Sequence, residues 1–99
     1  MKKITLTFYR DPGHGWLKVP VKVIKHLNLQ DQITTYSFQR NKHVYLEEDC
    51  DAPKVLNKLK EHNILVEIKE KHTNKSSKIR TYNHYINSLN GDVEWIQIG

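Results

Sequence analysis

The stretch that decides the fold is YSFQRNKHVYLEEDCD, residues 36–51. Apolar and polar residues alternate on both sides of Asn41-Lys42, a pattern typical of two strands joined by a tight turn. Asparagine tolerates the positive φ that a two-residue hairpin turn requires. The acidic residues near the end of the stretch, followed by Pro53, suit the first turn of a helix, with Asp49 or Asp51 as its cap. The stretch therefore predicts a hairpin that leads directly into a capped helix.

The residues before this hairpin predict a strand, a turn, a short helix and a second strand. Residues 3–9 alternate between apolar and polar side chains, which indicates a half-buried strand. Residues 11–15 contain a proline and two glycines and predict a turn. Pro20 suits the start of a short helix. Residues 33–39 alternate again and predict the first strand of the hairpin.

The residues after the hairpin complete an α+β pattern. Val55, Leu56 and Leu59 form the apolar stripe of a helix, and residues 64–68 predict a further strand. Residues 69–80 are polar and predict a loop, either ordered or mobile. Asn90-Gly91 lies between alternating residues and predicts a C-terminal hairpin over residues 82–98, with a short helix over residues 82–89 as the alternative. We therefore expect one domain, residues 1–99, with a mostly antiparallel sheet of five to seven strands and two helices packed on one face.

Charge and cysteine content narrow the function classes. The 99-residue chain has 16 Lys and Arg against 11 Asp and Glu, a net charge of +5. A basic balance favours a polyanionic partner, nucleic acid first, although a basic protein with no such partner remains the alternative. The single cysteine excludes a disulfide framework and suits a reducing, cytoplasmic setting. No apolar run approaches the ~20 residues of a membrane span, so we expect no membrane partner.

Four carboxylates, those of Glu47, Glu48, Asp49 and Asp51, form an acidic cluster. One interpretation is that they oppose the dipole of the following helix, each contributing ~0.3–1 kcal/mol. The alternative is a divalent cation held by the two aspartates and one glutamate, because hard cations prefer clustered oxygens. The first interpretation is favoured, so we expect no metal and no cofactor.

Residues 11–16, DPGHGW, are a second candidate site. His14 lies between two glycines, and histidine is the residue type whose ordinary chemistry suits proton transfer near neutral pH. Trp16 has a ring that stacks on a base or fills the core. If the protein is an enzyme, the candidate catalytic residues are His14, Glu47, Asp49 and Arg80; otherwise we assign none.

Basic and aromatic residues interleave along the chain and suit contacts with phosphates and bases. The alternative is a solvated lysine face over an aromatic core. The expected nucleic-acid contacts are Lys18, Lys22, Lys25, Arg40, Lys42, Lys75, Lys78 and Arg80 to phosphates, with Trp16 or Tyr82 stacking.

One resemblance covers residues 16–48, about a third of the chain. The segment resembles the AbrB/MazE-type swapped-hairpin DNA-binding domain, in which a strand ending in a hydrophobic-x-hydrophobic-Pro run precedes a short helix, an Asp-containing turn and a strand pair. The chain departs from that family in having Trp16 where a basic residue is usual at the strand start. The resemblance implies a homodimer that binds DNA. The residues that fall in the corresponding places are Leu17, Val19, Pro20, Ile24, Leu27, Leu29 and Asp31.

A second resemblance spans most of the chain. The stretches DPGHGWL, YS-aromatic-QR, VYLEEDCDA and IR-x-Y resemble small phage and mobile-element proteins of unknown function. They lie at residues 11–17, 36–40, 44–52 and 79–82. This resemblance implies a mobile-element context and supplies no activity and no catalytic residues.

The leading expectation is a non-enzymatic, phage-type accessory protein that binds a nucleic acid through a basic surface. One alternative is a protein-directed inhibitor of a host or defence complex. In that case Glu47, Glu48, Asp49 and Asp51 meet a basic host surface. Another is a small hydrolase or nucleotide-binding enzyme that uses His14. A small-ligand site is favoured if residues 11–16, 47–51 and 79–82 line one cleft.

Overall fold

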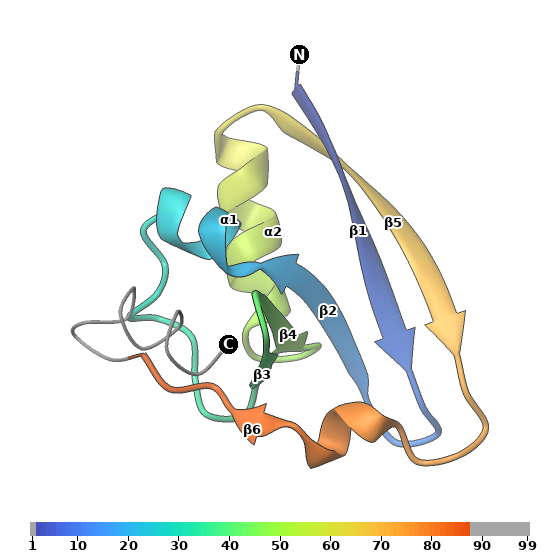
Figure 1. The fold of residues 1–99 in the computed structure, drawn as a ribbon. Helices are drawn as coiled ribbons and strands as arrows, with labels where there is room; N and C mark the ends of the chain where they lie inside the picture. The colour runs from blue at the N-terminus through green and yellow to red at the C-terminus, as the bar shows by residue number, and fades with distance from the viewer. Residues whose placement is uncertain (1, 88–99) are drawn as a thin grey trace.

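The computed structural model describes residues 2–87, which form one mixed sheet with two helices (Figure 1). Within this range the strands are β1 (Lys2–Arg10), β2 (Gly15–Pro20), β3 (Phe38–Arg40), β4 (His43–Glu47), β5 (Ile64–His72) and β6 (Asn83–His84). The helices are α1 (Val21–His26) and α2 (Ala52–Glu61), and a 3-10 turn, η1, covers Lys78–Thr81. Neither α1 nor α2 is long and apolar enough to cross a membrane.

The strand order is β5-β1-β2-β4-β3-β6. β1 pairs parallel with β5, and the four other pairings are antiparallel. A parallel pair needs a crossover, and β5, the parallel partner of β1, follows only after α2 (Figure 1). The α+β class, the mainly antiparallel pairing and the expected number of strands are therefore confirmed.

The apolar core covers one face of this sheet. Leu17 and Val19 of β2 lie opposite Leu46 and Val44 of β4, and all four side chains are fully buried. Strand side chains alternate between faces, so these four residues share one face. The same apolar cluster contains residues from β1, both helices and the loop after α1: Leu6, Ile24, Leu27, Leu29, Ile33, Val55 and Leu59.

The hairpin and the helix predicted from residues 36–51 are confirmed, with a shorter first strand. Asn41 has φ 55° at the turn, and Arg40 pairs with His43. The strand expected over residues 33–39 begins only at Phe38, because turns occupy most of residues 34–37. Asp51 is the N-cap residue of α2, but its side chain does not cap the helix.

The structure describes the polar segment 69–80 in full and the predicted C-terminal hairpin only in part. β5 continues to His72, so the expected loop begins as a strand and ends in η1. Residues 69–72 therefore belong to β5 and residues 78–80 to η1, which corrects the prediction of a loop over the whole of 69–80. Most of the hairpin expected over residues 82–98 lies outside the described residues; the part inside contains β6, which pairs with β3.

Candidate functional site

A basic hollow lies on the face of the sheet opposite the apolar core. Lys18 of β2 and Tyr45 of β4 are paired, and each neighbours residues that point into the core. Alternation therefore places Lys18 and Tyr45 on the other face. Two pockets of about 1110 and 580 Å³ adjoin here and share Lys18, Tyr45 and Tyr82. We call them together the basic hollow.

The charge of the basic hollow has one sign. None of the described residues that line it is Asp or Glu, although the chain has 11 of these residues. A concave surface lined by one sign of charge concentrates the field and attracts counter-ions. The described cations that line it are Arg10, Lys18, Lys22, Lys25, Arg40, Lys42, Lys71, Lys75 and Lys78.

Three tyrosine rings lie next to one another in the basic hollow. The ring centroids of Tyr9 and Tyr45 are 6.2 Å apart, and those of Tyr45 and Tyr82 are 5.1 Å apart. A cation lies over each ring, an arrangement that contributes ~0.5–1 kcal/mol at exposed positions and restrains the cation. The three pairs are Lys71 over Tyr9 at 6.0 Å, Lys18 over Tyr45 at 6.0 Å and Arg40 over Tyr82 at 4.9 Å.

Tyr45 and His43 are titratable residues of the hollow, and neither carries a negative charge near neutral pH. Burial raises the pKa of Tyr45 to about 12, so its hydroxyl remains protonated. Burial and the neighbouring Lys18 lower the pKa of His43, which lines the larger pocket. His43 is therefore neutral at pH 7 and gains a positive charge only in acid.

Asp11 ties the glycine loop to the segment that crosses the hollow. Asp11 is 4% exposed, and its carboxylate accepts two bonds from the guanidinium of Arg80, at 2.7 and 2.9 Å. It also accepts backbone N–H bonds from Gly13, His14 and Ser77, at 3.0, 2.9 and 2.9 Å. We call this set of contacts the Asp11–Arg80 latch. It fixes residues 77–80, and therefore one side of the basic hollow.

The latch leaves Asp11 unsuited to proton transfer. The Arg80 guanidinium, with the backbone donors, holds the pKa of Asp11 well below its usual range. A general base needs a pKa near the working pH, and Asp11 is too acidic for that role near neutrality. Arg80 also lies over the ring of Trp16, 5.2 Å from its centroid, so its guanidinium is held on two sides.

The carboxylates of Glu47 and Glu48 in the acidic cluster bind different partners. Glu48 pairs with Arg10, with a shortest N–O distance of 2.9 Å. Glu47 accepts backbone N–H bonds from Asp49 and Cys50 and closes its own turn. Asp49 is the exposed member of the cluster. Among the described residues, no three His, Cys, Asp or Glu side chains are grouped to hold a metal ion.

Asp51 is fully buried and binds the loop before β3. Its Oδ2 accepts bonds from the hydroxyls of Ser37 and Thr34, at 2.5 and 2.8 Å, and Lys54 donates to Oδ1 at 3.0 Å. Burial raises the pKa of Asp51, but these donors outweigh it, so the pKa lies below its usual value. Asp51 thus holds the turn that replaces the expected strand.

The stretches 11–16, 47–51 and 79–82 do meet. Asp11 joins the first to the third through Arg80, and the N–H of Glu48 donates to the carbonyl of Gly15 at 3.0 Å. They do not together line the basic hollow: its described lining residues include Ile79 and Tyr82 but none from 11–16 or 47–51. The basic hollow therefore does not meet the condition that favours a small-ligand site.

The residues named for an enzyme, His14, Glu47, Asp49 and Arg80, have separate surroundings. His14 is exposed and its ring lies 6.0 Å from that of Trp16. Arg80 is engaged by Asp11, and Glu47 by backbone N–H groups. The contacts described for these residues maintain the loop and the turn.

The sequence predicts seven of the nine described cations that line the basic hollow. Eight of the ten expected nucleic-acid contacts line it, all except Trp16 and Arg80. Trp16 is 2% exposed and supports Arg80, so it presents no ring face to a base. Alternation along β1 and β4 was a usable signal for Tyr9 and Tyr45, which the sequence reasoning missed. The two lining cations that the sequence does not predict, Arg10 and Lys71, reach the hollow through strand pairing that no local pattern gives.

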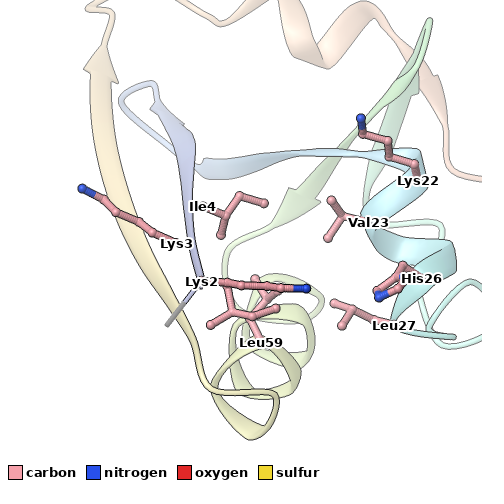
Figure 2. Close-up of a pocket in the computed structure, with 9 residues that line it drawn as sticks. Lys2, Lys3, Ile4, Lys22, Val23, His26, Leu27 and Leu59 are labelled. Atoms are coloured by element: carbon pink, nitrogen blue, oxygen red, sulfur yellow. The ribbon is translucent and has the colours of Figure 1, made fainter.

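A third pocket differs in kind from the basic hollow (Figure 2). It has a volume of about 470 Å³ and lies among β1, α1, α2 and the start of β5, with Ile4, Leu27 and Leu59 in its lining. Lys2 extends across it toward α1, whereas Lys3 points away and pairs with Glu67 at 3.5 Å (Figure 2). This pocket is an open end of the apolar core.

Comparisons with known proteins add no relative: no family model, no curated protein and no solved structure matches this chain.

Proposed function

We propose that this chain is a non-enzymatic accessory protein of the phage type that binds nucleic acid across the basic hollow. The observation that carries the proposal is the convergence of nine cations and no carboxylate among the described lining residues. Phosphate contacts supply most of non-specific nucleic-acid affinity, and Lys and Arg make them. The mobile-element context rests on the resemblance in residues 11–17, 36–40, 44–52 and 79–82.

We also propose that both helices pack their apolar side chains on the face opposite the basic hollow, while Lys22 and Lys25 of α1 reach the end of the hollow, which stays open to a long ligand. What supports this arrangement is that Ile24 of α1 and Val55 of α2 belong to the same apolar cluster as Leu17. Lys18 points from the same strand to the other face.

The proposed path runs from the end of the hollow with Lys22, Lys25 and Lys42 to the end with Lys75 and Lys78. The two ends meet at the residues that both pockets share, Lys18, Tyr45 and Tyr82. Because the contacts are cations on phosphates, binding tolerates changes of base sequence. The Asp11–Arg80 latch and Trp16 support this path without touching the ligand.

The test is fluorescence anisotropy with labelled single-stranded and double-stranded oligonucleotides over a range of salt. Affinity is expected to fall roughly tenfold or more over a fourfold rise in salt, because several phosphates are engaged. Binding that is undetectable, or that ignores salt, would reject the proposal.

A matched pair of variants locates the interface. Lys22→Glu with Lys42→Glu changes two cations of the hollow, and Lys58→Glu with Lys60→Glu makes the same charge change on α2. The first pair is expected to abolish most binding and the second to leave most of it. Equal losses would place the interface elsewhere.

The protein-directed inhibitor has less support. Glu47, Glu48 and Asp51 are each bonded within the chain, so the acidic cluster does not form one exposed patch. A stoichiometric protein partner recovered from host lysate after nuclease treatment would favour this alternative over nucleic-acid binding.

A further inference from the structure

β5 is an edge strand with one open side. It lies at the end of the strand order, and within residues 2–87 its only partner in the sheet is β1. On the outer side of β5 the described chain places no further element (Figure 1). Its side chains are largely exposed, Leu65 by 55% and Ile68 by 41%. The outward N–H and C=O groups of such an edge can pair with another strand.

The pairing with β1 fixes which face each residue of β5 occupies. Ile68 lies beside Leu6 of β1, which points into the apolar core. Even-numbered residues of β5 therefore lie on the core face, and odd-numbered residues lie on the face of the basic hollow. Glu67 and Lys69 share that second face, where Thr5 donates to Glu67 at 3.2 Å.

The charges of β5 are complementary to those of a second copy. Ile68 is the midpoint of Ile64–His72. In an antiparallel pair of two β5 strands with full overlap, Ile68 lies opposite Ile68 of the second copy. Glu67 then lies opposite Lys69 of the second copy, and the reverse pair repeats this contact. Opposite charges in directly opposed positions stabilise a strand pair.

Neighbouring registers pair fewer residues and place like charges opposite each other at their centre. A register that keeps the same faces must shift by two residues. One such shift places Lys69 opposite Lys69 at its centre, with Glu67 opposite Lys71 on each side and only seven residues paired, and the other places Glu67 opposite Glu67. Like charges in opposed positions are unfavourable. The full overlap is therefore the register that combines the longest pairing with attraction between charges.

We propose that two copies of this chain associate through β5, antiparallel and centred on Ile68. The six-stranded sheets of the two copies become one sheet of twelve strands. Charged edge strands often prevent such pairing; here the signs alternate, so the charges of one copy attract those of the other. The two basic hollows lie on the same side of the joined sheet. The proposal does not depend on what the hollow binds.

Cysteine cross-linking tests the register. In a Cys50→Ser background, Ile68→Cys places two thiols opposite each other, at a separation that suits a disulfide. Leu65→Cys is the matched control, because its two copies lie six residues apart along the strands, ~20 Å. We expect a covalent dimer from Ile68→Cys and none from Leu65→Cys under mild oxidation. Equal cross-linking of the two, or none at position 68, would overturn the proposed register.

Charge reversal tests the interface energetically. Glu67→Lys creates two like-charge pairs and is expected to raise the dimer Kd about tenfold or more. Lys69→Glu is expected to do the same, and the double variant restores the attraction and the wild-type Kd. Sedimentation equilibrium measures all three, with Lys60→Glu on α2 as a control that leaves Kd unchanged. A monomeric wild type at millimolar concentration, or a double variant as weak as the single ones, would sink the idea.

Discussion

The two faces of the sheet are built from the same strands but differ in what holds them. On the core face, Leu17 and Leu46 are opposed and fully buried. On the other face, the neighbouring pair Lys18 and Tyr45 lies in a hollow lined by cations. The polar half of an alternating strand is usually read as a solvated surface. In this chain the uniform positive charge of the polar face, more than its polarity, identifies that face as a candidate interface.

The largest expected effect is on the core face. Leu46→Ala removes a fully buried side chain and leaves a cavity, so we expect a loss of about 2–5 kcal/mol in the free energy of unfolding. Urea unfolding measures it. Leu65→Ala, at a side chain 55% exposed, is the control and is expected to change stability by less than about 0.5 kcal/mol. Similar losses at the two positions would contradict the contrast between a packed face and an exposed strand.

The next effect concerns the ion pair that supports the hollow. Asp11→Asn keeps the shape but removes the charge that Arg80 needs, so we expect the Tm at pH 7 to fall by several degrees. Because the folded pKa of Asp11 is lowered, its contribution to stability is complete above the unfolded pKa of ~3.9 and declines as pH falls below it. The Tm difference between wild type and variant should therefore shrink from pH 4 to pH 2. A difference that stays constant over this range would show that the charge of Asp11 is not responsible.

A third effect tests the hollow as a ligand surface. Lys18→Glu reverses the cation that both pockets share. We expect the affinity for an oligonucleotide to fall about tenfold, and the slope of log K against log salt to become less steep by ~0.7–0.9 for each phosphate that the variant no longer neutralises. Anisotropy titrations at several salt concentrations measure both values. An unchanged slope would mean that Lys18 does not meet a phosphate.

The smallest effect is a pH dependence of binding. Protonation of His43 adds a cation to the hollow, and its pKa lies below the ordinary ~6.5, so the gain appears only in acid. We expect oligonucleotide affinity to rise a few-fold between pH 7 and pH 5 in the wild type, and less in His43→Asn. Titrations of both proteins at matched ionic strength measure the difference. Identical pH profiles would exclude His43 as the source of any pH dependence.

The parts of the fold that the sequence predicts are those with local causes. Asn41 supports its turn through its own positive φ, and Val55 and Leu59 set the buried face of α2 by helical spacing. The strand expected over residues 33–39 begins only at Phe38, and the reason is non-local. Thr34 and Ser37 are held in a turn by Asp51, a buried carboxylate 14 to 17 residues later.

The candidate site divides in the same way. Composition and charge identify cations such as Lys22 and Lys42 without any knowledge of the fold. The role of Arg80 depends on Asp11, which is 69 residues away along the chain. A pairing over that distance leaves no local pattern, so Arg80 is predicted as a ligand contact and found in the Asp11–Arg80 latch. Lys71 reaches the hollow only because β5 pairs with β1.

The parallel pairing of β1 with β5 also affects the order in which parts of the sheet form during folding. The first strand of the described chain needs residues 64–72 as its partner, whereas the hairpin of β3 and β4 closes over a two-residue turn. Contacts between distant residues form late in folding, because the intervening chain must first be ordered. During synthesis, one side of β1 therefore stays unpaired until the ribosome has released β5. We expect refolding to show early formation of the β3–β4 hairpin and α2, with protection from hydrogen exchange arriving last at the β1 amides that pair with β5.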